Sequence, residues 1–592
     1  MKTYKYYFKF LFLIPSLCLS SEPPVGQSLP EPQHLPKQLN QNDTNELFQE
    51  QQRWREQQEL EARQRQLAEP DITVQSSPSE MQRTASKTAV IPAESPCYKI
   101  DHFIFEIPDS IPESIRIAST PSMPLGKFYF LNKKLAFAKG QCIGQKGINV
   151  IIEQLLLELM QRGYVTTRVG LVREQNLATG VLKISLLPGH IRAFRFDGET
   201  RANIDTAFPM KAGDILNLRD LEQGIEQIER QTSLALSMRL EPGDAPGESD
   251  IVLTLKRGKP WRVTLGFDDS GSPRTGQLQA SANIALYNPL GLNDVLIVSG
   301  THDIHQTSDI YGSQSLSAYY SVPWGNWTMT ATASNNKSHF FLRPQHTHHW
   351  ITEQKNIDGK IAYMFWRNQT QKNSIEMRIG KRWAHTHFGD LPLKVHQRNM
   401  TFAELAYIHR HHFGVAKLDV TTSYRWGVPW LGATDYVENA HALNYNLTIM
   451  DATLTLPFAM AGRIAYYTGT LRGQFTRTQQ ENSNYFSIGG RSTVRGFDSQ
   501  SSFSSEQGYF FRNEVQVPLK NTRQFFYLGA DVGQVFRKNA HHAPDTLTGA
   551  TVGMRGTLFP GMFYDAFIAA PLYQSTAINS STVMGLNVRY TF

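Results

Sequence analysis

Long hydrophobic runs are absent from this chain of 592 residues, because no window approaches the ~18 to 20 consecutive apolar residues of a membrane-spanning helix. Any segment that crosses a membrane must therefore be a strand. The net charge is +7, but no long tract of Lys and Arg accompanies it, which argues against nucleic-acid binding. The chain also lacks a Gly-rich phosphate-binding loop followed by Lys-Ser or Lys-Thr. The sequence therefore indicates neither a nucleotide cofactor nor a nucleic-acid partner.

The first 20 residues are typical of a secretory signal peptide. Three lysines precede an apolar stretch at 10–19, and small residues follow it. This stretch is too short to cross a bilayer as a helix. A short buried helix is the alternative interpretation. Because Leu17, and not a small residue, precedes Cys18, we predict no lipid anchor.

Cysteine is scarce, with three residues in the whole chain. Cys18 would leave with the signal peptide, so that Cys97 and Cys142 remain as an even pair in an oxidising compartment. A disulfide bond between these two is the default expectation. Closing that loop should contribute roughly 4 kcal/mol by the chain-entropy estimate. Zinc binding is the weaker alternative, because no histidine pair at ligand spacing accompanies either thiol.

The residues from 21 to 67 form a disordered segment followed by a predicted helix. The first part is rich in Pro and Gln, and Asp43 with Glu46 can cap the helix, which runs through Trp54 to Leu67. Apolar residues are too sparse here to give the helix a broad apolar face. Such a helix lies either in solvent or in a wet cavity, and the pattern alone favours solvent. A Ser-, Thr- and Pro-rich linker follows at 68–94.

The next zone reads as two small α+β repeats, at 95–187 and 188–258. Each shows a β-rich start, an amphipathic helix and a pair of strands. In the first repeat the helix carries its apolar residues on one face between Ile148 and Leu159, and Gly163 ends it. One larger α+β domain is the alternative.

The last zone, 259–592, alternates apolar residues with small polar ones at a period of two. The apolar positions of its first strand are Trp261, Val263, Leu265 and Phe267. This alternation is typical of strands between lipid and a wet lumen. A soluble β-sandwich would carry large aliphatic residues on one face and charges on the other. We therefore predict an all-β transmembrane barrel of about 16 antiparallel strands, within two either way, from the ~9 to 11 residues that one strand needs.

Two segments near the C-terminus depart from this pattern. The first is a long Ser- and Gly-rich connection that contains Val494, Arg495, Gly496 and Phe497. The second is a strand that contains Gly529, Asp531 and Gly533. A carboxylate in a barrel wall is costly unless it is paired, and an arginine on a folded-in loop is a suitable partner. From the residues alone, Arg495 can equally be a solvated loop residue.

The ordered set of these motifs resembles the superfamily of outer-membrane barrels that carry POTRA domains, and within it the two-partner secretion transporters. That branch exports haemolysins, filamentous haemagglutinins and contact-dependent inhibition toxins. The loop motif, the strand motif, the terminal Phe592, the two repeats and the N-terminal helix all fit it. Further similar segments are 243–250, 268–271 and 288–294. The resemblance extends from about Asn42 to Phe592.

The resemblance implies roles for particular residues. Arg495 would reach inside the barrel, and Asp531 would be its partner on the wall, with the neighbouring motif residues shaping the contact. The helix from Asp43 to Leu67 would lie in the pore as a plug, in place of the solvated position that its residues alone favour. The segment 230–233, Arg-Gln-Thr-Ser, departs from the Arg-Leu-Pro-Ser type of the relatives, which puts the substrate surface of the second repeat in doubt.

The implied function is that of an outer-membrane transporter. Its POTRA domains, in the periplasm, would recognise a large unfolded exoprotein, and the barrel pore would export it without nucleotide hydrolysis. A membrane-protein insertase of the same superfamily is the alternative. We expect a monomer that contacts outer-membrane lipid and, during biogenesis, the barrel-assembly machinery. The sequence leaves the cargo open between haemolysin, adhesin and growth-inhibition toxin.

An enzyme or a passive porin is the third class. Histidine clusters at 346–349 and 409–412 are a hint of metal chemistry. Neither is accompanied by a pattern of carboxylates, so we interpret both as exposed loop histidines. No nucleophile-elbow serine occurs with credible His and Asp partners. We therefore predict no catalytic residue and no metal site.

Overall fold

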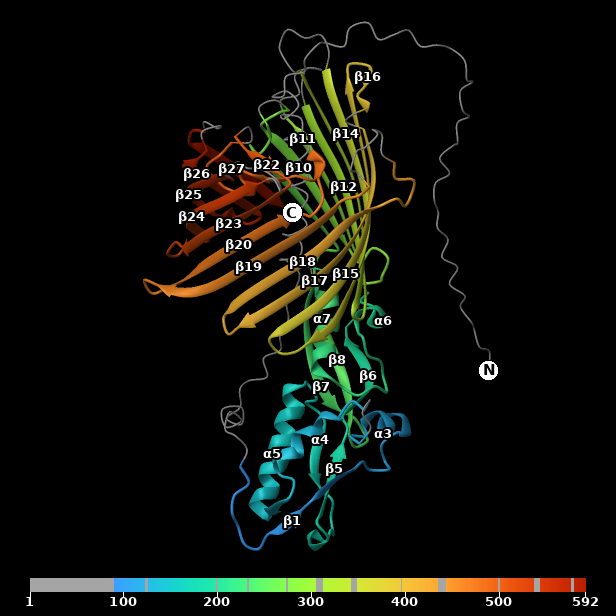
Figure 1. The fold of residues 1–592 in the computed structure, drawn as a ribbon. Coiled ribbons are helices and arrows are strands. Elements are labelled where there is room, and N and C mark those ends of the chain that lie inside the picture. Colours follow the sequence, from blue (N-terminus) through green and yellow to red (C-terminus); the bar gives the residue numbers. More distant parts are fainter. Residues whose placement is uncertain are drawn as a thin grey trace, which may run out of the picture. The chain divides into compact units, whose positions relative to one another are not determined.

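The computed structural model describes residues 90–592 with short gaps, which fall at 123–125, 199–200, 232–233, 273–274, 305–311, 342–348, 395–396, 435–442, 499–500, 537–543 and 576–579. The predicted signal peptide and most of the predicted linker lie outside the described residues. So does the whole predicted plug helix, with Asp43, Glu46, Trp54 and Leu67. Figure 1 shows the elements of the described part.

The first repeat consists of a three-stranded sheet covered by helices. Its strands pair in the order β2-β5-β4, with β2 parallel to β5 and β4 antiparallel to it. The core forms where the apolar face of α5 meets the sheet, around Ile151, Leu155, Leu182 and Ile184. Its elements are β1 (Tyr98–Ile100), β2 (His102–Glu106), α3 (Glu113–Ser119), α4 (Phe130–Lys134), β3 (Gln141–Ile143), α5 (Gln145–Gln161), β4 (Arg168–Leu171) and β5 (Val181–Leu187).

The second repeat has the same sheet topology, which favours two repeats over one larger domain. Its sheet order is β6-β8-β7, again with one parallel and one antiparallel pairing. Asn217 caps its main helix, because the Asn217 side chain accepts a hydrogen bond from the Arg219 backbone N–H at 2.8 Å. The elements are β6 (His190–Asp197), α6 (Ile204–Ala207), α7 (Leu218–Glu229), β7 (Leu234–Pro242) and β8 (Glu248–Arg257).

The predicted disulfide bond between Cys97 and Cys142 is confirmed, with a Cα–Cα distance of 5.3 Å. It joins the residue before β1 to β3, and these two strands form a small antiparallel sheet. Next to it, the Glu94 carboxylate accepts hydrogen bonds from the backbone N–H groups of Gly144 and Gly147, at 2.9 and 2.7 Å. The disulfide bond and this carboxylate together fix the start of α5.

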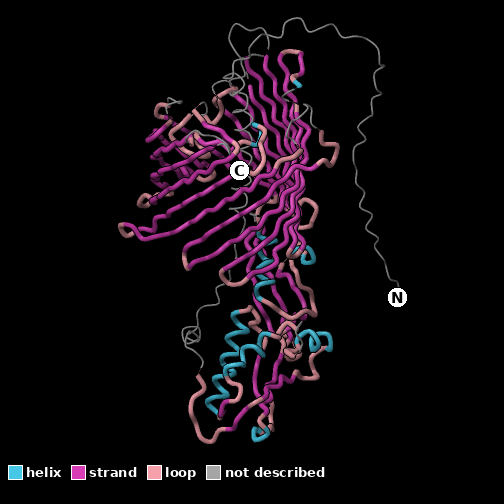
Figure 2. Tube along the Cα trace, in the orientation of Figure 1, coloured by secondary structure: helices cyan, strands magenta, loops and turns pink. Residues whose placement is uncertain are grey.

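The last zone is a closed antiparallel barrel of 16 long strands, as predicted. Every described α-helix precedes it in the chain. In Figure 2 the barrel is drawn almost entirely in the colour of strands and loops, with short helical turns. The strands are β9 (Trp261–Asp268), β10 (Gln279–Tyr287), β11 (Val295–Asp303), β12 (Gly312–Trp324), β13 (Trp327–Phe341), β14 (His349–Arg367), β15 (Gln371–Phe388), β17 (Arg398–Phe413), β18 (Ala416–Val428), β19 (Asn446–Met460), β20 (Arg463–Phe475), β23 (Gln507–Pro518), β24 (Gln524–Phe536), β25 (Asp545–Phe559), β26 (Met562–Gln574) and β27 (Val583–Thr591). The two-residue β16 (Leu391–Pro392) pairs with the end of β15.

The two faces of the barrel wall differ in chemistry. Along β17, Leu405 and Tyr407 are 52% and 43% exposed, whereas the opposite face carries the buried Glu404 and Arg410. Because successive strand residues point to opposite faces, the apolar set faces lipid and the charged set faces the lumen. The sequence predicted mainly small polar residues on the lumen face. The structure adds paired charges to it, such as Arg425 with Glu404 at 2.6 Å.

One prediction about histidines is wrong. His409, His411 and His412 belong to β17 and not to an exposed loop. A run of four polar residues resembles a loop, but here the strand continues to Phe413 before a short turn. Of the other cluster, His349 begins β14, and 346–348 lie outside the described residues. Among the described helices, none is long and apolar enough to span a membrane.

Candidate functional site

The connection between β20 and β23 folds back against the barrel wall. It contains two short paired strands, β21 (Phe486–Ile488) and β22 (Phe503–Ser505). Val494 and Phe497 are 0% and 2% exposed and share a small apolar core with residues of the wall strands. We call this connection, residues 476–506, the motif loop. Burial of these side chains keeps the motif loop attached to the wall.

Arg495 and Asp531 are in direct contact. The Arg495 guanidinium donates from Nε to Asp531 Oδ2 at 2.7 Å and from Nη2 to Asp531 Oδ1 at 2.8 Å. The Arg495 backbone N–H also donates to Oδ2, at 3.1 Å. The two side chains are 5% and 0% exposed. This is a bidentate, charge-assisted pair, the strongest geometry that these two groups can adopt.

The contact lies on the lumen face of the wall. On β24, Phe526 and Leu528 are 37% and 53% exposed, whereas Asp531 is 4% exposed and has the opposite parity. Successive residues of a strand point to opposite faces, so Asp531 points into the barrel. The motif loop therefore holds Arg495 inside the barrel.

Two further charged residues belong to this cluster, and sequence reasoning missed both. Arg495 Nη1 donates to Glu514 Oε2 at 2.6 Å, and Arg555 Nη1 lies 2.9 Å from Glu514 Oε1. We call Arg495, Asp531, Glu514 and Arg555 the loop cluster. The available sequence signal was a charged residue within an alternating strand. Such residues recur along most of the barrel, so this signal does not single out Glu514 or Arg555.

Glycines on the wall make room for the motif loop. A Cβ atom at Gly529 would lie 2.3 Å from Arg495 Nη2, and one at Gly533 would lie 2.8 Å from Val494 Cγ2. Gly549 on β25, which sequence reasoning did not single out, is closer still, since its Cβ would lie 1.7 Å from the Arg495 carbonyl oxygen. In the loop itself, the glycine at position 496 has a φ of +102°, a conformation that side chains disfavour. The motif glycines are therefore explained by close approach and backbone conformation.

A second cluster of charges joins the second repeat to the barrel. Arg367, at the end of β14, donates to Glu222 Oε2 at 3.3 Å and to Glu226 Oε1 at 2.8 Å, both on α7. Lys372, at the start of β15, donates to the other oxygen of Glu226. The side chains of Glu222, Glu226 and Arg367 are each no more than 5% exposed. We call Glu222, Glu226, Arg367 and Lys372 the docking cluster.

The β10–β11 turn and the strand β12 of the barrel contact the same domain. Asn293, in the β10–β11 turn, donates to the Asn203 carbonyl oxygen at 2.6 Å and to Thr206 Oγ1 at 2.8 Å. Arg230 Nη2, just after α7, donates to Ser321 Oγ at 2.6 Å. Arg230 opens the segment that departs from the relatives, and the structure gives it a contact with the barrel. The polar face of α7 is therefore an interface and not a solvated surface.

The docking cluster lowers the pKa of one of its carboxyl groups, that of Glu226. Burial alone would raise the pKa of Glu226, but the charges of Lys372 and Arg367 outweigh burial and hold that pKa below its usual range. Burial raises the pKa of Asp220, which lies on the same helix. Glu226 is therefore ionised at neutral pH, in the state that pairs with the barrel.

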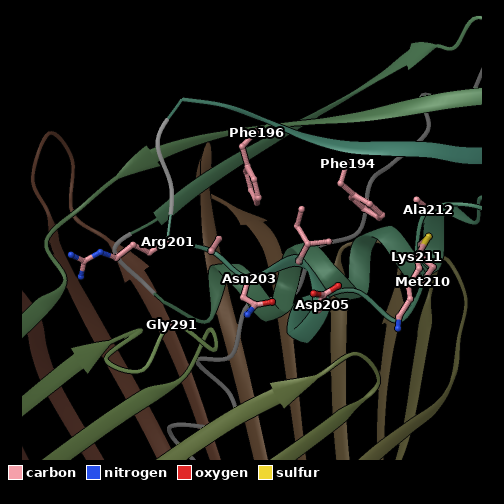
Figure 3. A pocket seen from close by; sticks show the side chains of 11 residues that line it. Phe194, Phe196, Arg201, Asn203, Asp205, Met210, Lys211, Ala212 and Gly291 are labelled. Carbon is pink, nitrogen blue, oxygen red and sulfur yellow. The ribbon is translucent and has the colours of Figure 1, made fainter. Parts of the chain in front are cut away.

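One pocket lies beside this interface, and Figure 3 shows it from close by. Its volume is about 630 Å³. Phe194 and Phe196 project from β6 toward the segment that carries Asn203 and Asp205, and Gly291 of the β10–β11 turn lies at its edge. Apolar rings with a few polar groups around them are typical of a site that binds side chains of a partner.

These features define the class of the protein, an outer-membrane barrel with a folded-in loop and two periplasmic POTRA domains. Models of POTRA domains match residues 125–189, described as ShlB-type, and 190–242. The family model described as haemolysin secretion/activation protein ShlB/FhaC/HecB matches residues 247–556. The chain belongs to this family of outer-membrane transporters.

Individual relatives agree with this assignment. The chain is 37% identical over 506 residues to the outer membrane transporter CdiB-2 of Burkholderia pseudomallei, and the match covers 83% of this chain and 86% of that protein. It is 27% identical to the hemolysin transporter protein ShlB of Serratia marcescens over 419 residues, 70% of this chain and 74% of that one. The structure of CdiB from Acinetobacter baumannii matches with a TM-score of 0.80 at 22% identity, over 94% of this chain and all of that chain. The named relatives support the transporter interpretation over the insertase alternative.

Proposed function

We propose that this two-partner secretion transporter binds an unfolded exoprotein at its POTRA domains and passes it through the barrel without nucleotide hydrolysis. The observation that carries this proposal is the docking of the second POTRA domain on the barrel, at the end of β14, at the β10–β11 turn and at β12. A chain bound on that domain is held next to the barrel opening. Folding of the exported chain outside the cell would then bias transport outward.

The first step would be strand addition at β6. In the described part of the chain, β6 has a ladder partner, β8, on one side. On the other side, a bridge to Ile215 and backbone hydrogen bonds with 213–214 occupy its first two residues, His190 and Ile191. An extended segment could add to this second side beyond the bridge by main-chain hydrogen bonds. Its side chains could enter the pocket of Phe194 and Phe196. This binding mode needs no folded partner and little sequence specificity, which suits an unfolded cargo.

A photo-crosslinking residue tests this step in the intact transporter. Placed at Phe196, it should capture a stalled exoprotein during export. Placed at Lys256, which is exposed on the strand β8 of the same domain, it should capture little. Equal capture at both positions would contradict binding at the pocket.

The transport function itself is tested in cells. The chain is expressed with a candidate exoprotein of the haemolysin or contact-dependent inhibition type, and the exoprotein is measured in the medium and in the periplasm. We expect secretion to require the chain, while other outer-membrane barrels assemble normally without it. Loss of those other barrels would support an insertase instead.

For the segment from Asp43 to Leu67 we propose the role of a plug. Its Glu-, Gln- and Arg-rich composition suits a polar barrel lumen. Deleting it should raise ion conductance through the reconstituted barrel while the heat-modifiable mobility of the barrel is kept. Unchanged conductance would mean that the segment does not occupy the lumen.

A further inference from the structure

Among the 16 long strands, the barrel closes through the shortest ladder, between β9 and β27. The two strands pair through the five residues from Asn587 to Thr591, whereas β9 with β10 and β26 with β27 each pair through eight. The part of β27 before Asn587 extends beyond this ladder. Each missing inter-strand hydrogen bond removes part of the closing free energy. Other contacts must therefore hold this end of the seam.

Asp269, the first residue after β9, supplies such contacts. Its carboxylate Oδ1 accepts a hydrogen bond from the Leu586 backbone N–H at 2.8 Å, and its own backbone N–H donates to the Leu586 carbonyl oxygen at 3.3 Å. The carboxylate takes the place of a ladder carbonyl. Asp269 and Leu586 therefore add one hydrogen-bonded residue pair to the seam, beyond the β9–β27 ladder.

The partner of this carboxylate comes from the motif loop. Arg491 Nη2 donates to Asp269 Oδ1 and, at 3.2 Å, to the Asp269 carbonyl oxygen. The Arg491 guanidinium also lies 5.2 Å from the ring centroid of Phe567 on β26. A Cβ atom at Gly585 on β27 would lie 2.8 Å from Arg491 Nη2, so this glycine leaves the space. Arg491 thus contacts residues on both sides of the seam.

Two arginines of the motif loop therefore fasten it to different parts of the barrel. Arg495 holds it to β24, and Arg491, four residues earlier, holds it to the seam. The two side chains of the seam pair are 27% and 20% exposed, so this contact is less buried than the loop cluster. A loop that leaves the wall must break both contacts.

We propose that Arg491 is a positioning residue that keeps the β9–β27 seam closed while the motif loop is inside the barrel. Withdrawal of the loop removes Arg491 from Asp269 and loosens the part of β27 before Asn587. The seam contact does not depend on the proposed export function. Its use during transport does rest on that function.

Hydrogen exchange in the reconstituted full-length protein, without cargo, tests the proposal. In Arg491→Ala, amides at 583–588 should exchange about tenfold faster, since a charge-assisted contact is lost. A peptide from β18 and β19 should exchange as in the wild type. The conservative variant Arg491→Lys, which keeps a positive charge beside Asp269, should recover part of the protection. Arg410→Ala, which removes an ion pair with Asp419 between β17 and β18, is the matched control and should leave the seam unchanged.

Arg495→Ala tests the coupling between the two contacts. This variant should also speed exchange at 583–588, although Arg495 does not pair with the seam residues, because the loop withdraws as one body. Unchanged exchange at the seam in this variant would overturn the link between loop withdrawal and seam opening. Wild-type exchange at the seam in Arg491→Ala would overturn the whole proposal, as would faster exchange throughout the barrel. Because no cargo is present, a failure here is distinct from a failure to export.

Discussion

The loop cluster and the docking cluster both join the barrel to an element outside its strand ladder, with opposite placement of charge. In the loop cluster the cation, Arg495, lies on the inserted element, and its carboxylate partners lie on the wall. In the docking cluster the carboxylates of Glu222 and Glu226 lie on the POTRA helix, and the cations lie on the barrel. In each cluster the central pair, Arg495 with Asp531 and Arg367 with Glu226, is no more than 5% exposed. Removing one partner from such a pair leaves the other charge buried and unpaired.

The clusters differ in how many side chains make the contact between the barrel and the attached element. Arg495 is the one guanidinium through which the motif loop reaches Asp531 and Glu514. Arg491 holds the same loop elsewhere, to Asp269, but does not reach these carboxylates. In the docking cluster two cations, Arg367 and Lys372, share Glu226, and the domain is also held by Asn293 and Arg230. We therefore expect the loop cluster to be more sensitive to a single substitution than the docking cluster.

The largest effect is expected for Arg495→Ala or Asp531→Ala. Each substitution leaves one buried charge without its partner, at a cost of about 3 to 5 kcal/mol, and should strongly impair secretion. The barrel should keep its heat-modifiable mobility on gels, because the strand ladder does not depend on this pair. The double variant should be little worse than either single one. Strictly additive losses in this double-mutant cycle would contradict the pairing.

A smaller effect is expected for Glu226→Lys, which places a third positive charge beside Arg367 and Lys372. The domain should undock in part, which spin labels at the exposed Glu241 and Lys520 would record as a broadened distance distribution. Adding Lys372→Glu should narrow the distribution again. If the single variant has the wild-type distribution, the docking cluster contributes little to holding the domain.

Little effect is expected from pH between 5 and 8. The pKa of Glu226 is lowered by its partners in the docked state, so the pairing is fully present above the ordinary glutamate pKa and is lost as pH falls through the lowered value. The same spin-label pair should therefore report unchanged distances in this window. Undocking between pH 8 and 5 would show that another titrating group controls the interface.

Among the substitutions, the smallest effect is expected for Glu514→Gln. Arg495 keeps its bidentate contact with Asp531, and Arg555 keeps Asp565 at 3.4 Å. The loss should be about 1 kcal/mol, typical of one hydrogen bond, and secretion should remain near the wild-type level. A loss as large as that of Arg495→Ala would mean that Glu514, and not Asp531, is the main partner.

Several features could be predicted from local patterns. Alternation along strands such as β9 indicated the barrel, and the apolar face of α5 indicated the helix that covers the first POTRA sheet. The disulfide bond between Cys97 and Cys142 could be predicted because these two cysteines remain after the signal peptide and the compartment is oxidising. The histidines of β17 were misassigned to a loop, because polar residues at a strand end carry no periodic signal.

By itself, the sequence determined the repeats, the barrel and the motif residues, since hydrophobic periodicity and glycine placement are local properties of the chain. Only the tertiary structure decided which charges meet. Arg367 and Glu226 are 141 residues apart, and Arg491 and Asp269 are 222 apart. A charge on a helix or strand has the same local pattern whether it faces water or a buried partner. Its role depends on tertiary packing, which excludes water from the pair, so that each charge interacts mainly with its partner.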